Sequence, residues 1–347
     1  MMPSASARPG KTGARLALIA ACLAVVVVGL GAFTRLSDAG LGCPDWPGCY
    51  GHLLWPRADH EIARADARFP DAPVIPGKPW PEMVHRYFAG SLALAILALA
   101  ALAWREREDR DYPRRLPLLL LFLVVWQALF GMWTVTLKLW PQVVTLHLLG
   151  GISVLALLWL LALRLRDRPW RVDSAVAHRL RALKPWVVLG LVTVFCQIAL
   201  GGWITSNYAA LACGDFPTCH GQWWPPMDFA RGFDVAQGVG PNYLGGLLES
   251  EARTAIHVGH RIGALVTTVM TLGLCAALAA IPWSGARRLA GALALALAVQ
   301  VSLGIANVHF RLPLPVAVAH NLGAALLLLT LVTLATRIWT LRDAHDH

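Results

Sequence analysis

The stretch LALIAACLAVVVVGLGAF, residues 16–33, has no charged side chain and is long enough to cross a membrane as a helix. A hydrocarbon layer about 30 Å thick needs roughly 20 apolar residues in helical form. This stretch is longer than the apolar core of a typical secretory signal peptide, and no small-residue cleavage site follows it. We therefore predict a membrane-spanning helix that is retained in the protein.

Similar apolar runs recur along the whole chain. Of its 347 residues, 57% are hydrophobic and 14% are charged, whereas a soluble domain carries about 25% charged residues. This balance excludes an ordinary soluble enzyme and a disordered chain, and seven cysteines are too few for a disulfide-rich secreted scaffold. We expect an all-α membrane protein whose eight transmembrane helices lie near residues 14–34, 84–104, 116–136, 143–163, 186–206, 255–282, 289–308 and 316–336.

Basic residues are distributed unevenly between the two ends of these helices. The two termini and the connections 105–115, 164–184 and 284–288 hold 19 of the 30 Lys and Arg residues, with 8 of the 20 Asp and Glu residues. Basic residues stay on the cytoplasmic side, so we predict that both termini are cytoplasmic and that the long loops 35–82 and 207–252 face outward. The net charge of +10 then reflects topology and excludes nucleic acid as a partner. The short basic start favours the bacterial cytoplasmic (inner) membrane.

The second half of the sequence repeats the first. Five features occur in the same order in each half: two cysteines in the long loop, a His-Arg pair, a Gln-x-x-x-Gly segment, a His 20 residues beyond that Gln and a basic residue 11 beyond it. In the first half they include Cys43, Cys49, His85, Arg86, Gln127, Lys138 and His147, and in the second Cys213, Cys219, His260, Arg261, Gln300, Arg311 and His320.

Each half contains four spans, an even number, so both halves have the same orientation. We predict two parallel-oriented, duplicated four-helix bundles. The predicted boundaries are a cytoplasmic N-terminal segment at 1–13, a first bundle at 14–163, a cytoplasmic linker at 164–185, a second bundle at 186–336 and a cytoplasmic tail at 337–347.

Four histidines lie in apolar sequence close to the outward ends of their spans: His85, His147, His260 and His320. A single His in such a helix is often explained by an interhelical hydrogen bond, but ionisable groups inside a membrane are costly and usually functional. Two imidazoles at one level of a four-helix bundle can bind both axial positions of a haem iron. Zinc normally has four N or S ligands, or three and a water. We therefore expect one haem in each half.

Four basic residues lie at the same outward level. Arg86 and Arg261 directly follow a predicted ligand, and Lys138 and Arg311 follow the third span of each half. They are candidates to pair with haem propionates, with Arg261 serving the second half. The alternative is that they extend to the membrane interface for solvation alone.

The residues three positions before the His-Arg pairs differ between the halves. Glu82 precedes His85, whereas His257 precedes His260. Glu82 is either an acid favoured by the helix dipole or a general base beside a reactive site. His257 is an alternative iron ligand to His260. This asymmetry suggests that one half carries out chemistry and the other carries electrons.

The two cysteine pairs of the long loops have two interpretations. Cys43 with Cys49, and Cys213 with Cys219, would face an oxidising compartment in which disulfides persist. Each pair is then a disulfide that closes a Pro-containing turn. The alternative is a redox-active thiol pair that passes electrons.

Taken together, these motifs resemble the haem A synthase family over about residues 15–340. The resemblance is carried by the segments GAFTRLSDAGLGCPDWPGCYG (31–51), PEMVHR (81–86), QALFG (127–131), TLHLLGG (145–151), GHRIGA (259–264), QVSLG (300–304) and AHNLGA (319–324). It implies an eight-helix duplicated bundle that oxidises a ring methyl of haem O to the formyl group of haem A through successive hydroxylations.

The resemblance also implies a role for individual residues. His85 and His147 match the ligands of the substrate haem O, and His260 and His320 match the ligands of a haem b cofactor that relays electrons. Glu82 matches the proposed catalytic carboxylate. The first cysteine pair matches a loop pair that some members carry.

Two other functions fit the same histidines. One is a two-haem membrane cytochrome that exchanges electrons with quinone, and the other is a parallel-repeat transporter or haem carrier. If the chain makes haem A, the expected partners are haem O, the lipid bilayer, a haem O synthase and a membrane electron acceptor. The acceptor's identity, the source of the oxygen atom and homo-oligomer formation are left open.

Overall fold

The protein is almost entirely helical. The computed structural model describes residues 9–109, 112–166 and 169–344, and eight helices in this part are long and apolar enough to cross a membrane. The prediction of an all-α protein with eight membrane-spanning helices is confirmed at this level. These helices are α1 (Pro9–Leu36), α3 (Pro79–Arg105), α4 (Arg115–Thr136), α5 (Pro141–Arg166), α7 (Lys184–Ser206), α9 (Ser250–Ala279), α10 (Ser284–His309) and α11 (Leu314–Trp339).

Their sequences explain both the helices and the surfaces they present. Proline occupies the first turn of α3, α7 and α11, where its missing N–H is not needed and its fixed φ suits a helix start. Large apolar side chains point away from the protein: Leu94 is 69% exposed, Leu265 65% and Val269 63%. Such a surface would be an aggregation hazard in water, whereas in lipid it is the expected exterior.

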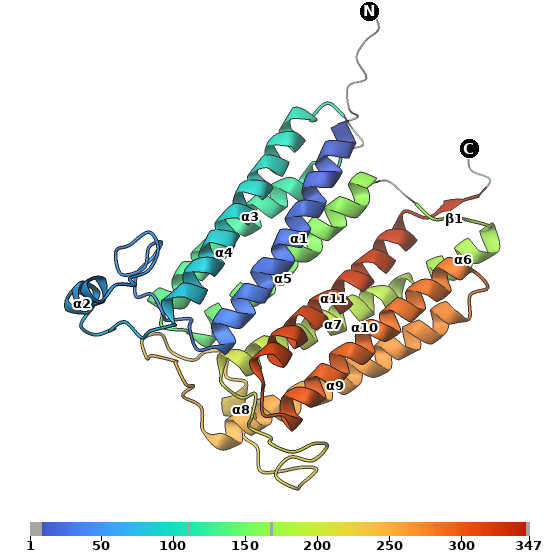
Figure 1. The fold of residues 1–347 in the computed structure, drawn as a ribbon. Helices are drawn as coiled ribbons and strands as arrows, with labels where there is room; N and C mark the ends of the chain where they lie inside the picture. Colours follow the sequence, from blue (N-terminus) through green and yellow to red (C-terminus); the bar gives the residue numbers. More distant parts are fainter. Residues whose placement is uncertain (1–8, 110–111, 167–168, 345–347) are drawn as a thin grey trace, which may run out of the picture.

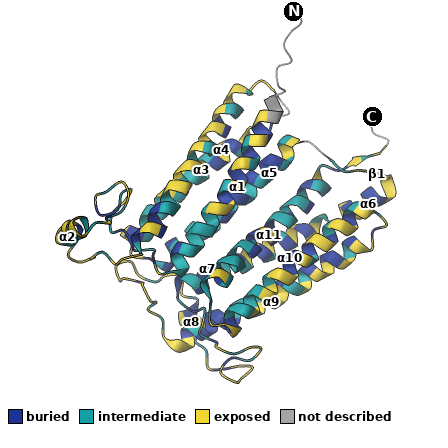
Figure 2. Ribbon diagram, in the orientation of Figure 1, coloured by how far each residue is buried: buried dark blue, intermediate teal, exposed yellow. Residues whose placement is uncertain are grey.

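The eight helices pack as two groups of four (Figure 1). In the first group, α1 packs against α3 and α5, and α4 closes the group against α3 and α5. In the second, α7 packs against α9 and α11, and α10 closes the group against α9 and α11. The groups meet through α1, α5, α7 and α11. Buried residues lie on the inner faces of the helices and exposed residues on the outer faces (Figure 2).

Polar contacts also join the two groups. The hydroxyls of Thr145 on α5 and Ser206 on α7 lie 3.0 Å apart and are buried. Trp159 on α5 donates its indole N–H to the hydroxyl of Thr333 on α11 at 2.8 Å. Lipid offers these side chains no hydrogen-bond partner. Both hydrogen bonds therefore favour the observed contact between the two groups of helices.

The short elements lie at the two ends of the helices (Figure 1). We call the end with the long loops the loop end. It contains α2 (Asp59–Arg68) and α8 (Phe229–Gly232). The opposite end contains α6 (Ser174–Ala182) and the parallel pair of β1 (Arg171–Val172) and β2 (Arg342–Asp343).

At the loop end, the second long loop reaches across to the first group of helices. The backbone N–H of Tyr243 donates to the carbonyl of Lys138 at 3.0 Å. The indole of Trp140 donates to the carbonyl of Gln237 at 2.8 Å, and the Gln142 amide donates to the same carbonyl at 3.1 Å. The turn between α4 and α5 is therefore bound to a loop that belongs to the other half of the sequence.

Each long loop begins with a small turn closed by a disulfide. The structure has disulfide bonds between Cys43 and Cys49 and between Cys213 and Cys219. Of the two interpretations of these cysteines, it thus shows the bonded form. In both turns the residue after the second cysteine has a left-handed backbone, with φ of 56° at Tyr50 and 55° at His220.

An aspartate stabilises this left-handed backbone in both turns. Asp45 accepts hydrogen bonds from the backbone N–H groups of Tyr50 at 2.5 Å and Gly51 at 2.7 Å. Asp215 accepts the corresponding bonds from His220 at 2.7 Å and Gly221 at 2.9 Å. A carboxylate with two backbone donors favours the ionised form.

The Asp215 turn should therefore loosen in acid. The hydroxyl of Thr218 and the N–H of Gly221 are the main causes that lower the pKa of Asp215 from 3.8 to about 2. A lowered carboxylate pKa means that its stabilisation is complete above pH 3.8 and is lost as the pH falls through about 2. We expect amide exchange at His220 and Gly221, corrected for intrinsic rates, to accelerate over this range.

The control is Asp215→Asn, which cannot ionise. We expect faster exchange in this variant at neutral pH and no further acceleration in acid. An acid response as large in the variant as in the parent protein would show that the Asp215 carboxylate is not its cause.

Candidate functional site

The four histidines singled out from the sequence lie in two pairs, one in each group of helices. On α3 and α5, the rings of His85 and His147 have centroids 6.4 Å apart and are nearly perpendicular, at 87°. His260 on α9 and His320 on α11 belong to helices that both pack against α7 and α10. A metal–imidazole bond is about 2 Å long, so the separation in the first pair suits one metal ion held between two rings.

Their surroundings suit a group that binds through two axial ligands. The Nδ1 atoms of His85, His147 and His320 are buried and make no regular hydrogen bond within the described part of the chain. The same part contains no cluster of three or more His, Cys, Asp or Glu residues that would hold a metal ion. A site for a bare ion such as zinc would need more protein ligands. The residues present therefore fit a haem in each half, whose porphyrin supplies the remaining ligands.

Each histidine ring packs against a glycine of a neighbouring helix. A Cβ atom at Gly31 would lie 3.0 Å from Cε1 of His85, and one at Gly304 would lie 3.1 Å from Cε1 of His320. The corresponding distances are 3.4 Å from Gly131 to His147 and from Gly201 to His260. Any side chain at Gly31 or Gly304 would thus displace an imidazole. Sequence reasoning had noted Gly131 and Gly304 but had missed Gly31 and Gly201.

Glutamine side chains lie beside the histidines of the second half. Nε2 of Gln197 on α7 is 3.0 Å from Nδ1 of His260, and Nε2 of Gln300 on α10 is 3.4 Å from Nε2 of His320. The sequence comparison of the two halves matched Gln300 with Gln127 but overlooked Gln197. The signal was present, since Gln197 and Gly201 have the same four-residue spacing as those two glutamines and their glycines.

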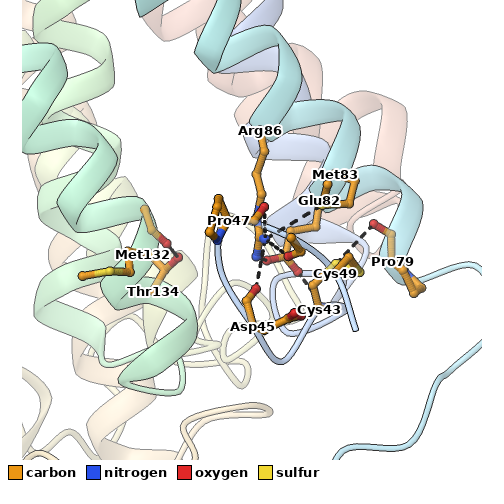
Figure 3. Close-up of polar contacts among 12 residues, drawn as sticks. Cys43, Asp45, Pro47, Cys49, Pro79, Glu82, Met83, Arg86, Met132 and Thr134 are labelled. Atoms are coloured by element: carbon orange, nitrogen blue, oxygen red, sulfur yellow. Dashed lines mark hydrogen bonds and ion pairs between the residues drawn. A yellow bond between two sulfur atoms is a disulfide. The ribbon is translucent and has the colours of Figure 1, made fainter. Parts of the chain in front are cut away.

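Glu82 is buried between the start of α3 and the first disulfide turn (Figure 3). Its side chain is close to solvent-free, with the residue 5% exposed. Oε1 pairs with Arg86 at 2.5 Å, and Oε2 accepts the backbone N–H of Cys43 at 3.1 Å. The carboxylate is thus fixed one helical turn before His85, at the loop end of the first pair.

The arginines that follow the predicted ligands are directed at the disulfide turns. Arg86 donates to the carbonyl of Asp45 at 3.0 Å (Figure 3) and to the carbonyl of Gly48 at 2.5 Å. Arg261 donates to the carbonyls of Asp215 at 2.7 Å and Thr218 at 2.8 Å. Each guanidinium group therefore attaches a disulfide turn to the helix that carries the arginine. The sequence did not predict this role, because the carbonyls that accept these hydrogen bonds come together only in the folded loop.

His257 occupies the position in the second half that Glu82 occupies in the first. It is buried, and its Nδ1 lies 3.0 Å from the carbonyl of Ala209 in the loop. Lys138 and Arg311 lie in the turns after α4 and α10, with φ of 49° and 57°. Within the described residues, no hydrogen bond or ion pair of these last two side chains is present.

Comparisons with known proteins extend over the whole bundle. The family of cytochrome oxidase assembly proteins named COX15-CtaA matches residues 14–332. The haem A synthase of Shewanella oneidensis is 46% identical over 318 residues, which cover 91% of this chain and 93% of that protein. The haem A synthase of Caulobacter vibrioides is 27% identical over 343 residues, covering 92% of this chain and 94% of its own.

The close approach of Gly42 to α3 provides a test of the Glu82 site. A Cβ atom at Gly42 would lie 2.3 Å from the carbonyl oxygen of Lys78, a backbone atom that cannot move aside cheaply. We expect Gly42→Ala to destabilise the protein by about 1–3 kcal/mol, as overpacking does, measured as a lower unfolding temperature in detergent.

Gly214→Ala is the matched control, because no atom lies within 4 Å of a Cβ at that position. We expect it to leave the unfolding temperature unchanged. Equal effects of the two substitutions would show that the first turn is not seated tightly on α3.

Proposed function

Because the chain belongs to the COX15-CtaA family of cytochrome oxidase assembly proteins, we propose that it is an oxidoreductase that converts haem O to haem A. The observation that carries this proposal is the 46% identity to a haem A synthase over 91% of the chain. The two histidine pairs within the spans support it, since a reaction on a haem needs a site that binds one. A multi-pass membrane location agrees with the eight apolar helices.

We also propose that the two groups of helices are duplicated, parallel-oriented bundles at 14–163 and 186–336. The packing order of the helices is the same in both groups. The eight non-glycine residues with positive φ in the described part form four matched pairs, namely Asp38 with Tyr208, Tyr50 with His220, Lys138 with Arg311 and Leu139 with Leu312.

The distribution of basic residues supports a topology for this arrangement. The segments at 1–13, 164–185 and 337–347 would lie in the cytoplasm, and the loop end would face outward from the bacterial cytoplasmic membrane. The outward side is oxidising, which agrees with the two disulfide bonds of the loop end.

In this proposal the two halves have different tasks. His85 and His147 hold the substrate haem O in the first half, and His260 and His320 hold haem b in the second. When bound, haem b supplies one-electron transfer. Among the acidic residues, Glu82 is buried and fixed beside the first pair, and the corresponding position in the second half is His257. This difference favours the first half as the place of the chemistry.

Glu82 is proposed as the catalytic carboxylate. Removing hydride or electrons from a ring methyl develops positive charge there, and a fixed carboxylate stabilises such charge without having to reorganise. It can also accept a proton from an attacking water. Arg86 and the N–H of Cys43 keep the carboxylate in place, so we propose Arg86 as a positioning residue in addition to its predicted propionate role.

The other binding roles remain proposals of the same kind. Lys138 and Arg311 are proposed partners for propionates at the loop end, together with Arg261 in the second half. A haem O synthase is a proposed partner because haem O is poorly soluble and is best passed on within the membrane. A membrane electron acceptor and a homo-oligomer complete the set.

The decisive experiment is to extract the porphyrins bound to the purified protein and to determine their masses. We expect haem b together with haem O, its hydroxylated form or haem A. Haem b alone would contradict the proposed function and would favour a two-haem cytochrome.

Glu82→Gln tests the carboxylate. A general base or charge-stabilising group is worth about 100-fold or more, so we expect haem A formation to fall by at least that factor while haem O loading stays normal. Glu61→Gln on helix α2 is the control and should have no effect, because glutamine can still accept the backbone N–H groups of Arg57 and Ala58 that Glu61 binds. Wild-type conversion by Glu82→Gln would exclude the carboxylate role.

A further inference from the structure

Three of the four histidines share a feature that the fourth lacks. The glycine that packs against each ring is preceded, four residues earlier, by a residue on the same face of its helix. For three rings this residue is glutamine, and for His85 it is valine. The segments are Gln127 to Gly131 beside His147, Gln197 to Gly201 beside His260, Gln300 to Gly304 beside His320, and Val27 to Gly31 beside His85.

A second position varies together with the first. The residue three positions after each histidine is glycine in the same three cases, and the glutamine side chain occupies the space that a Cβ atom would need. A Cβ atom would lie 1.8 Å from the side chain of Gln127 if built at Gly150, 2.3 Å from that of Gln197 if built at Gly263, and 2.4 Å from that of Gln300 if built at Gly323. The corresponding residue after His85 is Phe88. Val27 and Phe88 thus replace a glutamine and its glycine as a pair.

The glutamines can hold an iron-bound imidazole in place. A histidine that binds a metal through one nitrogen donates its other N–H to an acceptor, which fixes the ring and strengthens the ligand. The Oε1 atoms of Gln197 and Gln300 are buried and accept no hydrogen bond within the described residues. At present Nε2 of Gln197 lies 3.0 Å from Nδ1 of His260 and donates to the backbone carbonyl of His260, also at 3.0 Å. Half a turn of the amide would exchange that backbone bond for one in which Oε1 accepts from Nδ1.

His85 has no comparable side-chain acceptor at this position. Its Nδ1 atom, like those of His147 and His320, makes no regular hydrogen bond within the described residues. The side chain four residues before the packed glycine is therefore what distinguishes His85 from the other two.

We propose that Gln127, Gln197 and Gln300 are positioning residues for three iron-binding histidines, and that His85 is the least firmly held ligand. The haem of the first half is then the one that is released. This inference rests on the proposed function, in which the first half must take up haem O and release haem A while haem b stays bound.

The test measures release of haem from the purified holoprotein to excess apomyoglobin in detergent. In a His147→Ala background we measure haem release from the second half, and in a His320→Ala background we measure haem release from the first half. Each rate then belongs to one site, whichever porphyrin is bound there. In proteins with all four histidines, the mass of the transferred porphyrin gives the same assignment. We expect the first-half haem to leave faster than the second-half haem.

One variant of each half should change the release rate of its own haem, and the two changes are expected in opposite directions. Gln197→Met keeps the length of the side chain but removes the acceptor, and loss of such a partner typically weakens metal binding 10–100-fold. We expect release from the second half to accelerate by about 10-fold or more, and Gln197→Glu, which keeps an acceptor oxygen, to restore slow release. The double variant Val27→Gln with Phe88→Gly should slow release from the first half, whereas Phe88→Gly alone should not.

Faster release from the second half in the parent protein, or no effect of Gln197→Met, would overturn the inference. Equal release by the double variant and Phe88→Gly would overturn the part that concerns His85. These outcomes differ from a failure of the proposed function, which would show in the masses of the extracted porphyrins and leave the release rates interpretable.

Discussion

A polar group within a membrane-spanning helix must find its partner inside the protein, because hydrocarbon supplies none. The rest of this structure depends on that constraint. Backbone groups satisfy it by forming helices. Histidines satisfy it only in part, since three of the four rings keep a buried nitrogen without a regular hydrogen bond in the described part of the chain. Their rings pack against glycines of neighbouring helices, which agrees with the proposal that the histidines bind a group from outside the chain.

The two groups of helices share one packing order, and three of the many positions at which their sequences differ concern the same site. Glu82 corresponds to His257, Val27 to Gln197 and Phe88 to Gly263. All three differences lie around the first histidine of each pair, whereas the second histidines, His147 and His320, share a glycine three residues later with a glutamine side chain against it. These differences agree with the proposal that the first half binds a group that is exchanged and the second a group that is retained.

Much of the fold could be predicted from the sequence, because crossing a membrane requires length and apolarity that a single chain reveals. The second span was predicted at 84–104 and is observed at Pro79–Arg105, so the helix includes Glu82 within its first turn. Short elements such as α2 and α6 were not predicted, since their few apolar residues do not stand out.

The site was less predictable. Histidines are easily noticed in apolar sequence. The position of Gln197 beside His260 could not be predicted, because it depends on the space left by Gly263 on another helix. The roles of Arg86 and Arg261 depend on carbonyls that converge only once the disulfide turns have folded.

The second long loop belongs to the second half of the sequence but binds the turn between α4 and α5 in the first half. The two halves are therefore not separate units. Tyr243 donates a hydrogen bond to that turn, and Trp140 of the turn donates one to Gln237, so the turn is attached to a distant part of the chain. Helix α5 begins directly after the turn and carries His147. The two bundles are therefore interlocked at the end opposite to their covalent linker. A cut in the linker would leave them joined, and a shift of this loop would act directly on the start of the helix that carries His147.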